Sequence, residues 1–163
     1  MPMVNIVTGE VNAGKTTRMK ELFGQMAAAD GILSEKFFDK GIFCGYRLVH
    51  LQGGESMALA VPEAAFHGQF TEACRLGTFV FSAEAFRFGK EILGRLCADP
   101  NVSVLFLDEA GPLELGGQGF ADVLPTLLHS GKPLYMTVRS NCLQAFLRKY
   151  EIIEYRLIQV PLR

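Results

Sequence analysis

The sequence predicts a single α/β domain over residues 1–163, with a mainly parallel central sheet flanked by helices and an added antiparallel hairpin. Two observations support this fold class. Short apolar runs alternate along the chain with segments whose apolar residues recur every three to four positions. One pair of extended runs is instead separated by Gln52-Gly53-Gly54-Glu55, which is typical of a hairpin. Strands that alternate with helices favour right-handed crossovers, which place strands side by side in parallel.

The predicted elements of the first half follow in order. Val4–Thr8 is a short apolar run that ends in glycine, as expected of a buried strand. We expect Asp30-Gly31 to end the next helix and Ile32–Ser34 to begin a second strand. Ile42–Val61 holds the hairpin, and Pro62–Gly77, which has no clean period, is expected to be a loop or a short turn of helix. The apolar face of the first helix consists of Met19, Leu22, Phe23, Met26 and Ala27.

The middle of the chain continues the alternation. Thr78–Phe81 is a short β-prone run, and Ser82 is placed to cap the helix that follows. Asp99-Pro100 ends that helix, because proline disfavours the helical conformation of the residue before it. Val102–Leu107 is the most strand-like run, apolar apart from one serine and closed by Asp108.

The last third repeats the pattern. Leu134–Val138 is predicted to be a strand, and Ser140 is placed to cap a helix over 143–150. Ile152–Val160 is the last extended segment. Before these elements lies a further amphipathic helix, whose apolar face consists of Phe120, Val123, Leu124, Leu127 and Leu128.

Composition and charge exclude several classes of protein. Hydrophobic residues make up 49% and charged residues 20%, which argues against a disordered tail or a coiled coil. A formal net charge of -1 argues against general affinity for nucleic acid or anionic membranes. No apolar run reaches the roughly 18–20 residues that a membrane helix needs. The cysteines are dispersed and no signal peptide is visible, so we expect a cytoplasmic protein with reduced thiols.

Residues 9–16 match the phosphate-binding pattern G-x-x-x-x-G-K-[ST] without deviation. Glycines allow the backbone to wrap a phosphate chain, and N–H groups at a helix N-terminus point at the anion. Lys15 is expected to reach the β- and γ-phosphates, and the Thr16 hydroxyl to bind Mg²⁺. A glycine-rich turn beside a surface lysine is the alternative, but the place between a strand and a helix favours nucleotide binding. The expected nucleotide-binding residues are Gly9, Glu10, Val11, Asn12, Ala13, Gly14, Lys15, Thr16 and Thr17.

Two carboxylates, Asp108 and Glu109, directly follow the apolar run 102–107. In P-loop NTPases a carboxylate at the end of such a strand holds Mg²⁺ through water, and we assign this role to Asp108. Glu109 is the candidate base that orients and deprotonates an attacking water, which favours hydrolysis over transfer to another substrate. A strand that ends in a solvated acidic turn is the alternative. The stretch 115–118 is interpreted as a flexible loop that could border the γ-phosphate, with Glu114 and Gln118 as further candidates.

Taken together, these motifs resemble the THEP1-like nucleoside triphosphatases. The specific parts are the hairpin pattern G-Y-x-x-x-x-L…G-E and the block D-E-x-G-x-x-E-L, since many families share the P-loop. Other parts of the chain also resemble the family, so that the resemblance covers nearly the whole chain. The matching segments are Gly45–Leu51 with Gly54-Glu55, Leu76–Phe81, Leu107–Leu115, Gly131–Pro133 and Thr137–Arg139.

The resemblance implies a RecA-like P-loop fold and slow, Mg²⁺-dependent hydrolysis of ATP, GTP and other nucleoside triphosphates, with little base selectivity. Two residues depart from the family pattern. Pro112 stands where relatives often carry lysine, which removes one possible contact to the γ-phosphate. Arg139 stands where they often carry histidine; at the end of a strand it could stabilise charge on the transferring phosphate, or it could be a surface arginine paired with a carboxylate.

Two alternatives to the triphosphatase remain open. A small nucleoside or nucleotide kinase usually carries an arginine-rich lid, and Gly111–Gln118 contains no arginine or lysine. A nucleotide-binding accessory protein, with negligible hydrolysis of its own, would act on a protein partner that the sequence does not identify. Most of the 13 phenylalanines are expected in the core, although one or two could stack on a base.

Overall fold

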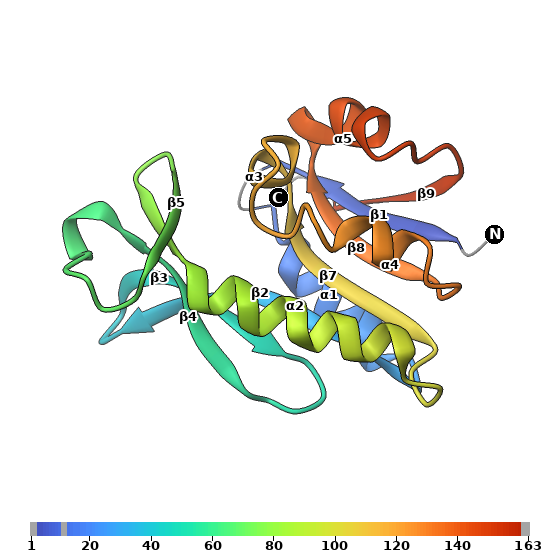
Figure 1. Cartoon of the computed structure of the whole chain (residues 1–163), viewed down its shortest axis with the longest axis horizontal. Coiled ribbons are helices and arrows are strands. Elements are labelled where there is room, and N and C mark those ends of the chain that lie inside the picture. The colour runs from blue at the N-terminus through green and yellow to red at the C-terminus, as the bar shows by residue number, and fades with distance from the viewer. Residues whose placement is uncertain (1–2, 11–12, 161–163) are drawn as a thin grey trace.

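A single sheet runs through the molecule (Figure 1). The structure is a computed structural model and describes residues 3–10 and 13–160. Within these residues the order of the strands is β5-β6-β4-β3-β2-β7-β8-β1-β9. The strands are β1 (Val4–Gly9), β2 (Ala29–Asp39), β3 (Ile42–His50), β4 (Ser56–Pro62), β5 (Glu72–Leu76), β6 (Phe79–Ser82), β7 (Val104–Ala110), β8 (Leu134–Arg139) and β9 (Tyr155–Gln159). The helices are α1 (Lys15–Gly24), α2 (Ala83–Ala98), α3 (Pro112–Leu115), α4 (Leu124–Leu128) and α5 (Leu143–Lys149).

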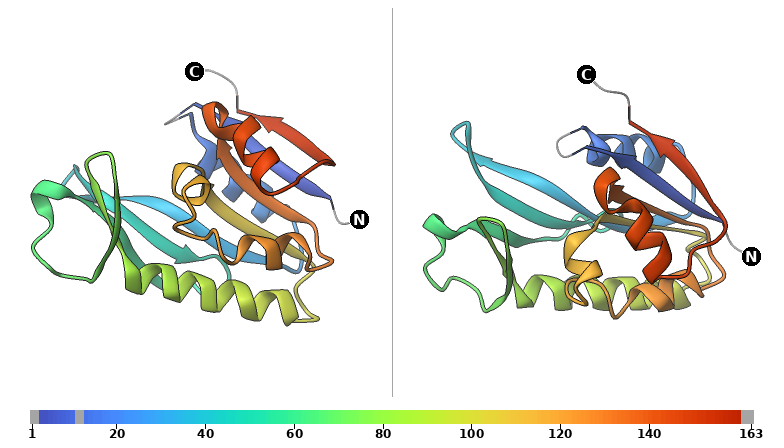
Figure 2. Two further views of the ribbon diagram at one scale, coloured as in Figure 1. Left: turned by 45° about the horizontal axis from the view of Figure 1, so that its top comes forward. Right: turned by 90° about the horizontal axis from the view of Figure 1, so that it is seen from above.

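Strands β2, β7, β8, β1 and β9 form the parallel part of the sheet. It is buried on both faces, so Leu105, Phe106 and Leu107 of β7 are all 0% exposed. Helix α1 covers one face, while α2, α4 and α5 cover the other (Figure 2). The α/β class with a parallel central part and helices on both faces is thereby confirmed.

The remaining strands, β3, β4, β6 and β5, extend the sheet in antiparallel fashion. Figure 2 shows this antiparallel extension projecting to one side, with α2 running beneath both parts of the sheet. The predicted hairpin is present as β3 and β4, but the extension is larger than one hairpin. Residues 62–77 were predicted to be a loop or a short turn of helix; a 3₁₀ turn is present at Glu63–Ala65, but the segment also contains strand β5. It is a short edge strand and is mostly exposed, which explains its lack of apolar periodicity; its Glu72 and Arg75 pair with each other at 2.9 Å.

The Asp30-Gly31 pair is part of β2 and does not end a helix, which corrects the sequence prediction. Helix α1 already ends at Gly24. Glycine is required at position 31 because a Cβ there would lie 2.0 Å from the carbonyl oxygen of Phe106 on β7. Gly31 therefore allows β2 to lie close to β7.

Helix ends agree with the sequence in part. Ser82 caps α2, accepting a hydrogen bond of 3.1 Å from the Ala85 N–H. Ser140 makes no capping bond and instead opens a short 3₁₀ turn (Ser140–Cys142) before α5. Helix α3 ends at Leu115, the first residue of the stretch 115–118 that was predicted to be a flexible loop. No helix in the described ranges is long and apolar enough to cross a membrane.

His50, at the end of β3, sits between two carboxylates. Its Nε2 lies 2.8 Å from the buried Asp30 and its Nδ1 lies 3.1 Å from Glu55. Burial by itself lowers the pKa of His50, but the two hydrogen bonds and the nearby negative charges outweigh it and raise the pKa.

A raised pKa means that protonated His50 stabilises the fold below the unfolded value of about 6.5, and that this contribution is lost as pH rises through the folded value. We expect His50→Gln to lower the free energy of unfolding at pH 6 and to have less effect at pH 8, measured by urea denaturation. His67→Gln, at an exposed histidine, serves as the control. An equal effect of His50→Gln at both pH values would contradict this account.

Candidate active site

Strands β1, β7 and β8 end at the same edge of the sheet, and their last residues surround one cavity. Gly9 pairs with Arg139 across β1 and β8, and Asp108 and Glu109 lie near the end of β7. The cavity has a volume of about 820 Å³. It is lined on one side by the start of α1 and on the other by the antiparallel extension. The sequence-predicted residues of the three strands therefore lie together.

The start of α1 brings the P-loop residues to the cavity. Gly14 adopts φ 90°, a conformation that favours glycine, and α1 begins at Lys15. The Lys15 ammonium folds back and donates to the carbonyl oxygens of Glu10 at 2.7 Å and of Gly9 at 3.3 Å. Burial lowers the pKa of Lys15, although the negative charge of Glu109 opposes this change. Ala13 and Thr17 also line the cavity, and the predicted Val11 and Asn12 lie outside the described residues.

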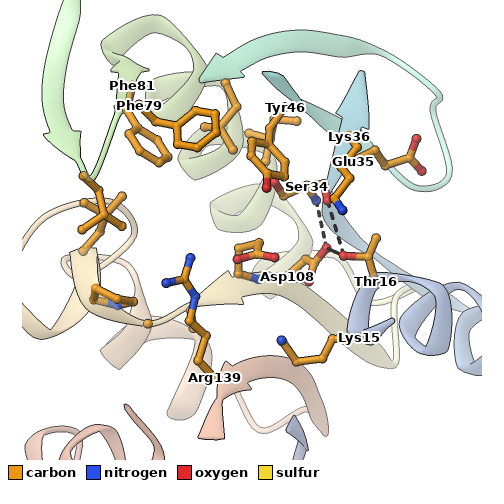
Figure 3. Close-up of a pocket in the computed structure, with 18 of the residues that line it drawn as sticks. Lys15, Thr16, Ser34, Glu35, Lys36, Tyr46, Phe79, Phe81, Asp108 and Arg139 are labelled. Carbon is orange, nitrogen blue, oxygen red and sulfur yellow. Dashed lines mark hydrogen bonds between the residues drawn. The ribbon is translucent and has the colours of Figure 1, made fainter. Parts of the chain in front are cut away.

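Asp108 is 1% exposed and connects β7 to α1 and β2. The Thr16 hydroxyl donates to its Oδ2 at 2.7 Å, and the Ser34 N–H donates to the same oxygen at 3.1 Å (Figure 3). Burial raises the pKa of Asp108, whereas these hydrogen bonds oppose the rise. The two residues predicted to hold Mg²⁺ are thus in direct contact.

Thr137, on β8, links both acidic residues. Its hydroxyl donates to Asp108 Oδ1 at 2.7 Å and accepts from the Glu109 N–H at 2.6 Å. The Glu109 N–H also donates to Asp108 Oδ1 at 3.0 Å. Glu109 has φ 64°, a left-handed conformation that is strained for a side-chain-bearing residue and is held here by these bonds. This conformation interrupts the regular alternation of side chains along β7, where the pairing with β8 shifts between Leu107 and Ala110.

Glu109 lies deep among protein atoms, yet its side chain is exposed to solvent inside the cavity. Burial, together with the charge of Asp108, raises the pKa of Glu109 to about 7, while Arg139 and Lys15 oppose the rise. A carboxylate with a pKa close to neutrality is suited to accept a proton from a bound water.

Arg139, the last residue of β8, points into the cavity between Lys15 and the aromatic side chains of the extension (Figure 3). Among the described residues, none of the salt bridges involves this arginine. Its charge lowers the pKa of both Glu109 and Lys15, so it acts on the site through the electric field.

Glu114 holds the segment after β7 in a defined shape. Its carboxylate accepts hydrogen bonds from the Gly111 N–H at 2.8 Å and the Phe120 N–H at 2.9 Å, and burial raises its pKa. The expectation of a flexible loop at 115–118 is corrected, because α3 ends in this stretch and Glu114 closes it into a compact turn. Gln118 is exposed and does not line the cavity, whereas Pro112 does.

Sequence reasoning missed three residues of the site. Thr137 is the polar position in the otherwise apolar run 134–138, and Ser34 directly follows the apolar pair Ile32-Leu33; these positions are the only local signals of their role. The signal for Tyr46 is its place in the hairpin pattern G-Y-x-x-x-x-L, which supported the family resemblance but gave the tyrosine no role. Tyr46 belongs to β3, far along the sheet from β1, and its hydroxyl reaches the cavity beside Asp108 (Figure 3).

The donor set around Thr16 and Asp108 fits Mg²⁺. A hydroxyl and a carboxylate are the oxygen ligands that Mg²⁺ prefers, and the ion usually keeps several waters and substrate phosphates in its shell. In the described part of the chain no group of three His, Cys, Asp or Glu residues could hold a metal. The Thr16 hydroxyl and the Asp108 carboxylate are the two protein oxygens that would hold such an ion.

A family model described as NTPase matches residues 5–161 of the chain. The chain belongs to this family. Relatives include the nucleoside-triphosphatase THEP1 of Methanocaldococcus jannaschii, which is 26% identical over 154 residues, 90% of this chain and 84% of that protein. THEP1 of Pyrococcus abyssi is 27% identical over 145 residues, 86% of this chain and 76% of that protein. The family, that of the THEP1-like nucleoside triphosphatases, agrees with the resemblance inferred from the motifs.

Two solved structures share the fold. The crystal structure of THEP1 from Aquifex aeolicus superposes with a TM-score of 0.72 at 21% identity and covers 97% of this chain and 90% of that one. The solution structure of a human cancer-related nucleoside triphosphatase gives a TM-score of 0.68 at 22% identity, over 99% and 89% of the two chains. The P-loop NTPase fold expected from the sequence is therefore confirmed.

We expect Thr137→Val to lower the free energy of unfolding by about 1–3 kcal/mol, because the buried Asp108 loses a donor and the Glu109 N–H loses an acceptor. Thr137→Ser keeps the hydroxyl and should lose less. Urea denaturation of the two variants tests this, and a valine variant as stable as the serine variant would show that the hydroxyl does not support the site.

Proposed function

We propose that the protein hydrolyses nucleoside triphosphates to diphosphate and phosphate, with Mg²⁺ as cofactor and little selectivity for the base. The observation that carries this proposal is the contact between Thr16 of the P-loop helix and Asp108, with Glu109 beside it and open to the cavity. The names of the relatives, nucleoside triphosphatases, support the same reaction.

Each residue has a separate role in the proposed reaction. Lys15 leaves its two carbonyl partners to bind the β- and γ-phosphates, together with N–H groups of the loop. Thr16 and Asp108 hold Mg²⁺, which when bound neutralises phosphate charge and orients the γ-phosphate. Glu109 takes a proton from water, and the water oxygen attacks the γ-phosphorus. The bond from the γ-phosphorus to the β–γ bridging oxygen breaks. Arg139 stabilises charge on the γ-phosphoryl group as it is transferred.

The other two functions have weaker support. The segment 111–118 has no arginine or lysine and is held by Glu114, which does not fit a cationic kinase lid. An accessory role is favoured by Pro112, which lines the cavity at a position where the family resemblance implies a lysine, and by the untested role of Arg139. From the formal net charge of -1 we further propose that the protein has no general affinity for nucleic acid, and from the dispersed cysteines that it is cytoplasmic.

The first test is phosphate release from ATP, GTP, CTP and UTP, with and without Mg²⁺. We expect slow release with each nucleotide only when Mg²⁺ is present. Glu109→Gln should reduce it about 10²- to 10⁴-fold, because the general base is lost, and Lys15→Ala should weaken nucleotide binding. Glu91→Gln and Lys40→Ala, at exposed positions outside the cavity, are the matched controls. Undiminished hydrolysis by Lys15→Ala would refute the proposal.

Arg139 is tested separately. We expect Arg139→Ala to lower kcat about 10- to 1,000-fold with a smaller change in KM, because the arginine acts mainly on charge that develops in the transition state. Arg139→Lys keeps the charge and should recover part of the rate. An unchanged kcat in Arg139→Ala would assign this arginine to the surface.

A further inference from the structure

Strand β2 continues past the end of its parallel pairing and reaches the cavity. It pairs with β7 only from Ala29 to Ile32 and then runs on to Asp39 as one strand of the hairpin with β3. Ser34, just beyond the paired part, donates its N–H to Asp108 at 3.1 Å. The residues that follow Ser34 on β2 therefore lie next to the carboxylate that is proposed to hold Mg²⁺.

Lys36 is the cation that this part of β2 brings to the cavity. Side chains alternate between the two faces of a strand, so Lys36 lies on the same face as Ser34, about 6–7 Å further along. Its partner across the hairpin is Tyr46, and both residues line the cavity. Figure 3 shows Lys36 beside Ser34, across the cavity from Lys15 and Arg139.

The order of the strands places the acidic pair between two cations. Strand β7, which carries Asp108 and Glu109, lies between β2 and β8. Lys36 belongs to β2, and Arg139 is the last residue of β8. A phosphate group bound beside the acidic pair is therefore flanked by one positive charge on each side.

The segment that follows β7 supplies no such charge. Gly111–Gln118 contains no lysine or arginine. Pro112, which lines the cavity, has no N–H to donate. Positive charge on the side of β7 away from Arg139 therefore has to come from β2.

The charge of Lys36 is available to a ligand. Lys20, another lysine that lines the cavity, is paired with Glu35 at 2.7 Å. Lys36 is exposed, and within residues 3–10 and 13–160 none of the salt bridges involves it. A lysine has a flexible four-carbon stem and three rotatable donors. Its ammonium can thus turn to an anion without first giving up an ion pair.

Contacts from the P-loop do not by themselves distinguish a triphosphate from a diphosphate. Lys15 reaches the β-phosphate as well as the γ-phosphate, and Mg²⁺ bridges the two. Strand β2 is separated from β1, which leads into the P-loop, by β8 and β7. In the proposed reaction the phosphate on that side, beside Glu109, is the γ-phosphate. A cation on β2 is therefore suited to bind this phosphate alone.

We propose that Lys36 binds the γ-phosphate and is the residue by which the site distinguishes nucleoside triphosphates from nucleoside diphosphates. This proposal rests on the proposed function, because it takes the γ-phosphate to lie beside Glu109. Lys36 donates an N–H to a non-bridging oxygen of the γ-phosphate, from the side opposite Arg139. The contact is lost when the γ-phosphate has been hydrolysed and has left, so the diphosphate is held less tightly.

Binding of unreactive nucleotides tests this assignment without any hydrolysis. Isothermal titration calorimetry of the full chain, with Mg²⁺ present, compares the β,γ-imido analogue of ATP with ADP. We expect the wild type to bind the analogue more tightly. Lys36→Ala should raise the Kd of the analogue roughly tenfold, the effect of losing one hydrogen bond between charged groups, and leave the Kd of ADP unchanged. Lys36→Arg keeps the charge and should recover part of the loss.

Lys40→Ala is the matched control. Lys40 lies between β2 and β3 of the same hairpin, is exposed and does not line the cavity. The control removes one positive charge as well, and we expect it to leave both Kd values unchanged. Equal weakening of the analogue by Lys36→Ala and Lys40→Ala would show a long-range attraction and overturn the contact.

The remaining outcomes separate this assignment from the hydrolysis. Unchanged binding of the analogue by Lys36→Ala, an equal loss for the analogue and for ADP, or a wild type that binds both equally overturns the role of Lys36, while phosphate release still tests the triphosphatase. A loss for the analogue alone, in a protein that releases no phosphate from ATP, would refute the hydrolysis and retain Lys36 as the residue that recognises the terminal phosphate.

Discussion

The arrangement of the site depends on one buried carboxylate. Asp108 accepts four hydrogen bonds, two from the Thr16 hydroxyl and the Ser34 N–H and two from the Thr137 hydroxyl and the Glu109 N–H. An ionised carboxylate in an apolar interior is costly unless donors surround it. The donors come from α1, β2, β7 and β8, so satisfying this group fixes the relative positions of all four elements.

The grouping of Lys15, Asp108 and Glu109 around one cavity was predictable because its signals are local. The P-loop pattern and the Asp108-Glu109 pair each occupy a few consecutive residues that follow an apolar run, and parallel strands bring such ends together. The left-handed backbone of Glu109 was not predictable, since it results from hydrogen bonds to Thr137 on another strand. Partners of this kind are separated in sequence and leave only a single polar residue in a strand as a sign.

Much of the fold was predictable for the same reason, and the exceptions are informative. Apolar runs that alternate with helical segments indicated the parallel strands, because strands buried on both faces consist mainly of apolar residues. Strand β5 lies at the exposed edge and carries no such constraint, so its residues show no period. Asp30-Gly31 looks like a helix stop, but the glycine is required by contact with Phe106, which sequence spacing does not show.

The Lys15 ammonium donates hydrogen bonds to the carbonyl oxygens of Glu10 and Gly9. An incoming anion must therefore exchange with two internal acceptors and does not meet a bare charge. Exchange of this kind reduces the net gain from any single phosphate group, because the lysine gives up bonds as it makes them. A longer polyphosphate, which also contacts the loop N–H groups and a metal ion, recovers the difference. Under the proposed function, this exchange would favour chains of phosphates over small single anions.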